Sequence, residues 1–161
     1  MSIVNTAPNI SPGMVVRVVN TLSSAVATGT TLIPFDDTIP QNTEGTEFMT
    51  LAITPQATTN ILVIQAVFFG AHSVLSELAM ALFQDTTANA LAATSCTIPV
   101  ASYRATLTLT HTMTAGTTSA TTFKIRGGGN TAGTTTFNGV SAGRIYGAIT
   151  KSSIVIWEYK A

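Results

Sequence analysis

The chain has 161 residues, of which 45% are hydrophobic and only 9% are charged, and its seven basic and seven acidic side chains cancel. Nucleic-acid-binding proteins draw affinity from excess Lys and Arg, so this balance excludes nucleic acid as a partner. The charged fraction lies far below the roughly 25% of an average soluble domain, and low charge favours association. We therefore expect the chain to pack against copies of itself; the alternative is a single β domain solvated by Thr and Ser hydroxyls.

The beginning of the chain is predicted to be an arm. Residues 1–13 carry Pro8, Pro12 and Gly13, which favour an extended arm or linker, and 14–161 form one domain large enough for a hydrophobic core. The first six residues lack a basic and a long apolar segment, so no secretory signal is predicted. If the protein acts outside cells, we expect it to leave by lysis.

The first half of the chain is predicted to form strands. β-Branched and apolar runs cover 14–20, 48–54, 60–69 and 77–84, and 25–28 is a candidate for a shorter strand. The apolar stretch 61–83 has the length of a membrane span, but Gln65, His72 and Glu77 interrupt it, so no membrane insertion is expected. Helical spacing of apolar residues leaves an amphipathic helix over 74–82 as the alternative to the second strand.

The second half is dominated by threonine, which fills 30 positions of the chain. Thr alternates with apolar residues over 103–114, and this period of two predicts a strand with one apolar and one hydroxyl-bearing face. Further strands are expected at 121–126, 134–138, 144–148 and 153–160, joined by a hairpin loop at 115–119 and turns at 127–133 and 139–143. Eight to ten short strands without strand–helix alternation predict an all-β jelly-roll sandwich.

Three segments resemble one known family. Residues 33–45 match the pattern I-P-x-D-D-T-I-P-Q-x-T-E-G, residues 130–139 resemble the turn N-x-A-G-T-x-x-x-N-G, and residues 152–158 resemble the closing strand S-S-I-x-I-x-E. The chain thereby resembles tail-fibre, tail-tip and other virion structural proteins of bacterial viruses. The resemblance implies a jelly roll similar to tumour-necrosis-factor and complement-head domains, which assemble as homotrimers.

The resemblance also implies a function. We expect a non-enzymatic virion protein, a trimeric tail-fibre or spike head that binds the host surface and is found in the virion or outside the lysed host. Its partners would be itself, other virion proteins and a host surface glycan or protein. The alternatives are a capsid decoration or head-fibre protein without a receptor, a carbohydrate-binding module, and a small cytokine-like domain of cellular origin.

The candidate receptor contacts lie in three predicted loops, because loops carry binding residues on a rigid sandwich. They are Asp85, Thr87 and Asn89 in the first loop, Thr117 and Ser119 in the second, and Gly128 and Asn130 in the third. The glycines of the third loop are expected to serve a hairpin turn with positive φ rather than a phosphate cradle.

No catalytic, cofactor or metal site is predicted. His111 is expected to pack on the apolar face of its strand, and His72 is expected at the surface of a turn. Asp36 and Asp37 form the adjacent acidic pair that a hydrolase or a calcium site would use. They are too few for either, and their expected role is to bind backbone amides in turns.

Several remaining side chains have structural readings. Cys96 is the sole cysteine, so no internal disulfide forms, and we expect a buried, inert thiol. Trp157 is interpreted as a core or subunit-interface anchor, with sugar stacking as the alternative. The strand-borne cations, among them Arg17 and Arg126, are expected to pair with Glu47, Glu77 or Glu158. The expected core and trimer seam comprise Phe68, Phe69, Phe83, Tyr103, Phe123 and Trp157.

Overall fold

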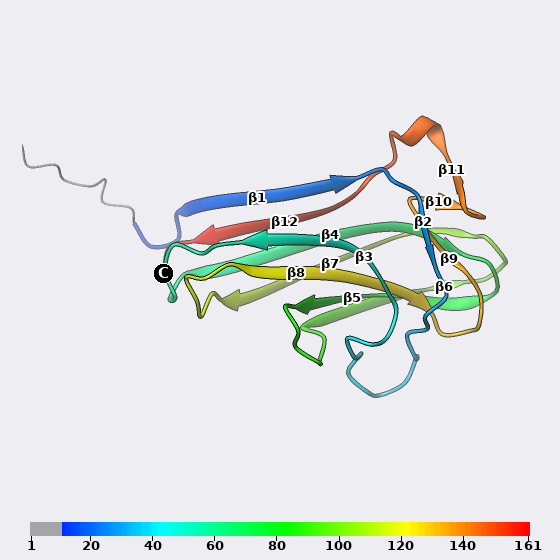
Figure 1. Ribbon diagram of the computed structural model, residues 1–161, viewed down its shortest axis with the longest axis horizontal. Coiled ribbons are helices and arrows are strands. Elements are labelled where there is room, and N and C mark those ends of the chain that lie inside the picture. The colour runs from blue at the N-terminus through cyan, green and yellow to red at the C-terminus, as the bar shows by residue number, and fades with distance from the viewer. Residues whose placement is uncertain (1–10) are drawn as a thin grey trace, which may run out of the picture.

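The structure is a computed structural model that describes residues 11–161. Residues 1–10 of the predicted arm lie outside this range. The N–H of Gly13 donates to the carbonyl of Lys160 over 2.7 Å, so the start and the end of the described chain lie side by side (Figure 1). The proposed division at residue 14 stays a prediction.

The larger of two sheets is built around one long strand. β4 (Ile61–His72) pairs with β7 (Arg104–Thr114) along one edge and, along the other, first with β12 (Ser152–Tyr159) and then with β9 (Thr135–Phe137). β1 (Val15–Ser23) adds to β12, and β2 (Ala27–Gly29) adds to β9. All these pairings are antiparallel.

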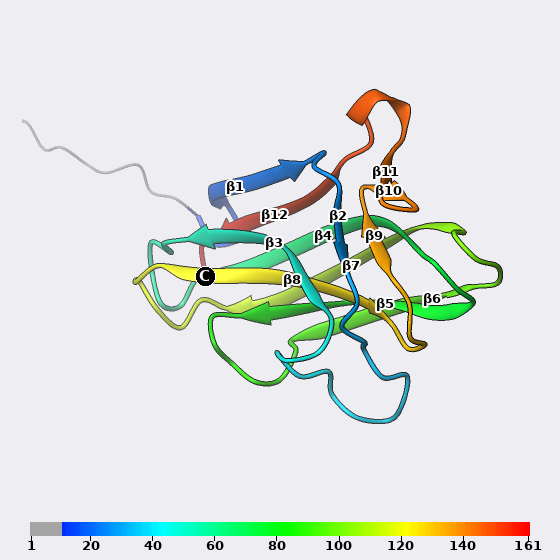
Figure 2. The ribbon, with the colours of Figure 1, turned by 45° about the vertical axis from the view of Figure 1, so that its right-hand side comes forward.

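The smaller sheet lies against the larger one and is also antiparallel (Figure 2). Its order is β3 (Thr46–Ile53), β8 (Thr121–Gly129), β5 (Ser76–Gln84) and β6 (Ala92–Ile98). Two short strands, β10 (Gly139–Val140) and β11 (Gly143–Arg144), form a separate hairpin before a 3-10 turn, η1 (Tyr146–Ala148). The predicted all-β, jelly-roll-like two-sheet sandwich is confirmed.

The strand faces follow the sequence alternation. On β7, Leu107 and Leu109 are buried, whereas Thr106, Thr108 and Thr110 are exposed. The predicted two-faced strand is therefore confirmed. Its apolar face is buried between the sheets, and its branched hydroxyl side chains tolerate water on the other face.

Residues 74–82 do not form the alternative helix, because β5 occupies them from Ser76 onward. The strand lacks alternation since both of its faces are covered. Leu78, Met80 and Leu82 belong to the main core, while Ala79 and Phe83 pack with Ile33 in a second cluster. The segment before β3 thus covers the outer face of β5, and a strand buried on both faces reads as a continuous apolar run.

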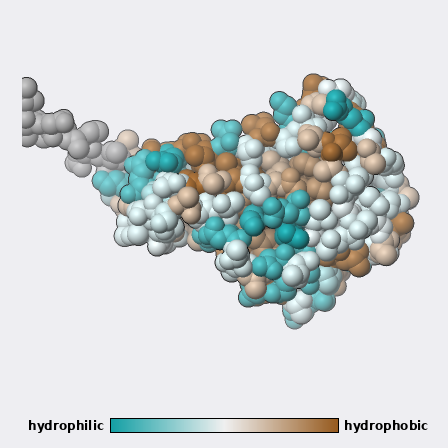
Figure 3. Space-filling view, in the orientation of Figure 1, coloured by the Kyte–Doolittle hydropathy of each residue, from teal (hydrophilic) through white to brown (hydrophobic). Residues whose placement is uncertain are grey.

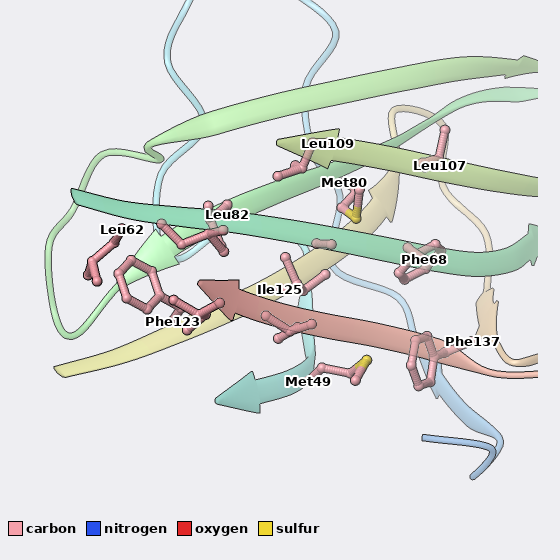
Figure 4. Packing of buried hydrophobic residues seen from close by; sticks show 14 of the residues in the cluster. Met49, Leu62, Phe68, Met80, Leu82, Leu107, Leu109, Phe123, Ile125 and Phe137 are labelled. Carbon is pink, nitrogen blue, oxygen red and sulfur yellow. The ribbon is translucent and has the colours of Figure 1, made fainter. Parts of the chain in front are cut away.

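The core fills the space between the two sheets with side chains from both (Figure 4). Phe48, Phe68 and Phe137 form an aromatic group at one end, with the rings of Phe48 and Phe137 stacked at 5.1 Å. Phe83 and Phe123 are fully buried, as predicted. Phe69 and Trp157 instead lie on the outer face of the larger sheet, and Tyr103 is 51% exposed.

The glycine-rich turn predicted at 127–133 is wrong in its first half. Gly127, Gly128 and Gly129 continue β8, are buried, and none has a positive φ. These positions are glycine because neighbouring atoms lie too close to the backbone to leave room for a side chain. A Cβ on Gly128 would lie 2.5 Å from the carbonyl oxygen of Thr31, and one on Gly127 would lie 2.8 Å from the ring of Phe68.

The strand predicted at 144–148 is also wrong. Tyr146, Gly147 and Ala148 all have positive φ, between 47° and 70°, which an extended strand does not permit. This stretch forms η1, and it stands out from the sandwich above β10 and β11 (Figure 1, Figure 2).

Candidate functional site

The first predicted contact loop follows β5, and its polar side chains hydrogen-bond to neighbouring segments of the chain. The carboxylate of Asp85 accepts the hydroxyl of Thr121 at 2.7 Å and the N–H of Thr122 at 2.8 Å. Asn89 accepts the side-chain amide of Gln41 at 3.0 Å. Both residues have a structural role, and Asp85 has a positive φ of 50° that suits a tight turn.

The three predicted loops do not form one surface. Thr117 and Ser119 precede β8, on the side where Asp85 bonds Thr121, whereas Asn130 follows the other end of β8. A nine-residue strand spans about 26 Å, so the first two loops and the third lie at opposite ends of the sandwich. Gly128 is not in a loop at all. The role of these residues in receptor contact stays a prediction.

The outer face of the larger sheet carries no charge over most of its width. Besides Arg104, which begins β7 at the margin of this face, the residues whose side chains share it are Val18, Asn20 and Leu22 of β1, Ser153, Val155, Trp157 and Tyr159 of β12, Ile61, Val63, Gln65, Val67 and Phe69 of β4, and Thr106, Thr108, Thr110, Thr112 and Thr114 of β7. We call this set the neutral face. Apolar side chains dominate three of its strands and hydroxyls the fourth.

Large side chains on the neutral face remain accessible to solvent. Val18 is 48% exposed and Leu22 is 59% exposed, with half-buried Trp157 opposite Val18 in the register. Contiguous apolar surface of this kind marks interaction sites in soluble proteins. The predicted core position for Trp157 is thereby excluded, whereas its role as an interface anchor remains open.

Charge gathers on the opposite, smaller sheet. Glu47 lies 3.7 Å from Lys124 and 3.5 Å from Arg126, and the guanidinium of Arg126 also donates to the carbonyls of Glu44 and Gly45. Glu47, Lys124 and Arg126 border a hollow of about 240 Å³ together with Asp85. Both cations pair with Glu47, as the expected cross-strand pairing predicts.

His72 is not the surface residue that the sequence suggested. It ends β4, is 1% exposed, and bonds through its two ring nitrogens to the hydroxyl of Thr135 and the carbonyl of Thr131, both at 3.0 Å. The sequence predicted a turn at 70–73, whereas β4 continues to His72 and buries its side chain. Its neighbours are strand and loop atoms rather than an acid or a nucleophile.

Beside His72 lies a small cavity of about 250 Å³, which we call the end pocket. Its lining residues are Ala71, His72, Ser73, Thr134, Thr136, Ser141 and Ala142. The hairpin of β10 and β11 closes one side, since the N–H of Ala142 donates to the hydroxyl of Thr136 at 3.1 Å. Sequence reasoning missed this pocket because its walls come from three distant segments.

Three titrating groups depart from their ordinary behaviour. Burial lowers the pKa of His111, which is half-buried on the inward side of β7 as predicted. Burial, and secondarily the carboxylate of Glu77, raises the pKa of the Cys96 thiol. Hydrogen bonds from the Thr38 hydroxyl and N–H lower the pKa of Asp36, which confirms its predicted turn role.

Some kinds of site are absent from the part of the chain that the structure describes. Residues 11–161 contain no group of three or more His, Cys, Asp or Glu side chains placed to hold a metal ion. Within the same residues, no helix has the length and apolar character needed to cross a membrane.

The fold and its surfaces define a two-sheet β-sandwich domain. Residues 29–161 match the family model described as the Pgp3 C-terminal domain, and the chain belongs to this family. The match supports a β-sandwich domain of that family; the tail-fibre assignment is finer than this and stays a prediction. No curated protein matches the chain in amino-acid sequence.

Solved structures similar to this chain are distant. The sugar-binding EclA C-terminal domain is 13% identical, covers 74% of this chain and 77% of its own length, and has a TM-score of 0.42. A structure titled for family CBM4 is 18% identical over 83% of this chain and 79% of that one, with a TM-score of 0.42. A structure of infectious bursal disease virus is 13% identical over 100% of this chain and 43% of that one, with a TM-score of 0.45. None of them carries an argument about what this chain binds.

Proposed function

We propose that this chain is a non-enzymatic structural domain that assembles as a homotrimer through its neutral face and binds a host surface. In the form that the sequence resemblance implies, it is the head of a virion tail fibre or spike. It works outside cells after release by lysis, attached to other proteins of its particle. A decoration protein without a receptor would share the assembly but not the binding.

The neutral face carries this proposal. A sheet surface that exposes Val18 and Leu22 and has its charged residue, Arg104, only at its margin is costly in water, and its centre can be covered by an identical surface without burying an ion. The charged side chains Glu47, Lys124 and Arg126 lie on the other sheet, where an assembly would leave them in solvent. The few charged side chains are thus placed so that association through the larger sheet is favoured.

A trimer would bind a surface more tightly than a single chain, because it is multivalent. Three copies around one axis present three identical loop sets, and linked weak sites gain avidity over a single site by roughly 10²–10⁴-fold. A hydrolase is disfavoured because His72 is engaged by Thr135 and Thr131, and because Asp36 is engaged by Thr38.

One pair of variants tests the assembly. Val63→Glu places a carboxylate at the centre of the neutral face, and Thr50→Glu places one on exposed β3 of the smaller sheet, opposite Lys124. Native mass should fall to that of one chain for Val63→Glu and stay unchanged for Thr50→Glu. Assembly that survives Val63→Glu in a folded protein would contradict the neutral face as the seam.

A further inference from the structure

The end pocket is surrounded by unusual backbone. Among residues 11–161, most of the non-glycine positions with positive φ lie in two segments next to it: Ser102, Asn138, Ser141, Ala142, Tyr146 and Ala148. Ser141 and Ala142 line the pocket, and the hydroxyl of Ser102 lies 3.1 Å from that of Ser141. Left-handed backbone outside glycine costs folding energy, and such positions cluster at ligand sites.

The pocket walls offer hydroxyl groups with unused hydrogen-bonding capacity. Ser73 accepts the N–H of Thr134 at 2.8 Å, and Thr136 accepts the N–H of Ala142, so each hydroxyl hydrogen remains available for donation. A volume of about 250 Å³ is slightly below the roughly 300–1,000 Å³ of sites for drug-sized ligands. A single ring-sized polar group suits this space.

The cations of residues 11–161 fall into two groups. Arg17, Lys124 and Arg126 are all within 4 Å of a carboxylate, whereas Arg104, Arg144 and Lys151 have no ion pair or side-chain hydrogen bond within these residues. Arg104 lies directly opposite Ala71 of the pocket in the β4–β7 register, and Arg144 lies two residues after Ala142. Glu77, on the smaller sheet at this end, is engaged by the hydroxyl of Thr97.

Exposed aromatic rings accompany the free arginines. Tyr103 directly precedes Arg104 and is 51% exposed, and Tyr146 follows Arg144 by two residues and is 72% exposed. The surface in this region shows hydrophobic and hydrophilic residues next to each other (Figure 3). Rigid amphipathic Tyr rings give large contact area at low entropic cost, and their faces suit the C–H groups of a sugar ring.

We propose that the end pocket and its rim, Tyr103, Arg104, Arg144 and Tyr146, bind an anionic sugar residue of a surface glycan. The hydroxyls of the pocket receive the ring hydroxyls of the sugar. The arginines pair with its carboxylate or sulfate, and a tyrosine covers its apolar face. This assignment rests on the surface-binding part of the proposed function and names its ligand class; a bare phosphate or nucleic acid would not require the sugar-sized pocket.

The test uses the full chain with defined saccharides. Calorimetric titration with sialyllactose, a heparin disaccharide and neutral lactose should give binding to one of the two anionic probes and none to lactose. Sialyllactose carries a carboxylate without sulfate, whereas the heparin disaccharide carries both, so binding of sialyllactose shows that a carboxylate suffices and binding of the heparin disaccharide alone shows that sulfate is needed. Arg104→Gln and Arg144→Gln should each weaken binding about tenfold, because a charge-assisted bidentate pair is lost. Lys124→Gln removes a charge on the other sheet and should leave binding unchanged.

The experiments distinguish failure of the sugar site from failure of the proposed trimer. Binding of neither anionic probe, equal binding of lactose, or an Arg104→Gln, Arg144→Gln double variant that is folded and binds as wild type would overturn the sugar site, whatever the native mass. Because the pocket lies within one chain, Val63→Glu should bind a monovalent probe like the wild type. A monomeric wild type that binds sialyllactose or the heparin disaccharide through the two arginines would refute the assembly and support the site.

Discussion

Arg17 on β1 and Glu158 on β12 face each other across adjacent strands, with Arg17 Nε 3.8 Å from Glu158 Oε2. The carboxylate is fully buried, and its Oε1 accepts the N–H of Gln56 and the side-chain amide of Asn60, both at 2.6 Å. Oε2 has no hydrogen bond within the described chain. One carboxylate therefore ties β1 and the β3–β4 connection to the last strand.

Removing this carboxylate should destabilise the domain. Glu158→Ala leaves the buried side-chain amide of Asn60 and the part-buried N–H of Gln56 without an acceptor, and loss of a buried partner costs about 1–3 kcal/mol. We expect a loss of roughly 3 kcal/mol in the free energy of unfolding, measured by urea denaturation. Arg17→Met should cost less, because the 39% exposed Arg17 lies 3.8 Å from Oε2 without a hydrogen bond to it, and both hydrogen bonds to Oε1 stay in place. Equal stability of Glu158→Ala and wild type would refute the role of Glu158 as a tie.

Stability should also respond to acidification through His111. Its pKa in the folded state lies below the ordinary 6.5, because burial disfavours the charged ring. Below pH 6.5 the unfolded chain therefore takes up a proton that the folded chain resists, and stability falls as the pH drops towards the folded-state pKa.

The check is a pair of urea titrations above and below this pH. Wild type should lose stability on acidification, and His111→Gln should lose less over the same interval. Identical pH dependence in wild type and His111→Gln would contradict the assignment.

The glycine run of β8 should tolerate no side chain at Gly128. A Cβ there would collide with backbone, the carbonyl of Thr31, and overpacking of a well-packed interior costs about 1–3 kcal/mol or more. Gly116→Ala is the matched control, since its φ is +67° but nothing lies within 4 Å of the added Cβ. Thermal unfolding should show a clearly lower midpoint for Gly128→Ala than for Gly116→Ala, and the reverse order would overturn this account.

Cys96 should react slowly with alkylating reagents. Its raised pKa reduces the thiolate fraction, which is the reactive form. Iodoacetamide labelling near pH 8, where a free thiol with a pKa of about 8.5 is partly ionised, should be much slower in the native protein than in guanidinium chloride. Equal rates in the two solvents would show an accessible, ordinary thiol.

Alternation explains how much of the fold the sequence predicts. The Thr and Leu pattern of β7 specifies its two faces, because a period of two has one spatial meaning. The glycines of β8 led to a wrong prediction of a turn, because glycine occurs both in turns and where other atoms pack closely against the backbone. The atoms that pack here belong to Thr31 and Phe68, which are far away in sequence. The same reasoning explains the misplacement of His72, whose burial depends on Thr131 and Thr135.

The candidate site was harder to predict than the fold. The end pocket joins the end of β4, the β8–β9 connection and the β10–β11 hairpin, and no local pattern signals that these segments meet. Nothing in the local sequence distinguishes the exposed, unpaired Arg104 and Arg144 from Arg126, which forms an ion pair. Only the register, which sets Arg104 opposite Ala71, distinguishes them.

The native mass of the full chain in solution, by light scattering on a size-exclusion column, tests the central claim most directly. The account predicts three times the chain mass of 16.7 kDa, and a return to a single chain mass in Val63→Glu but not in Thr50→Glu. Resistance of the wild-type mass to moderate salt is expected as well, because an uncharged seam gains nothing from ionic attraction. A monomeric wild type would contradict assembly through the neutral face.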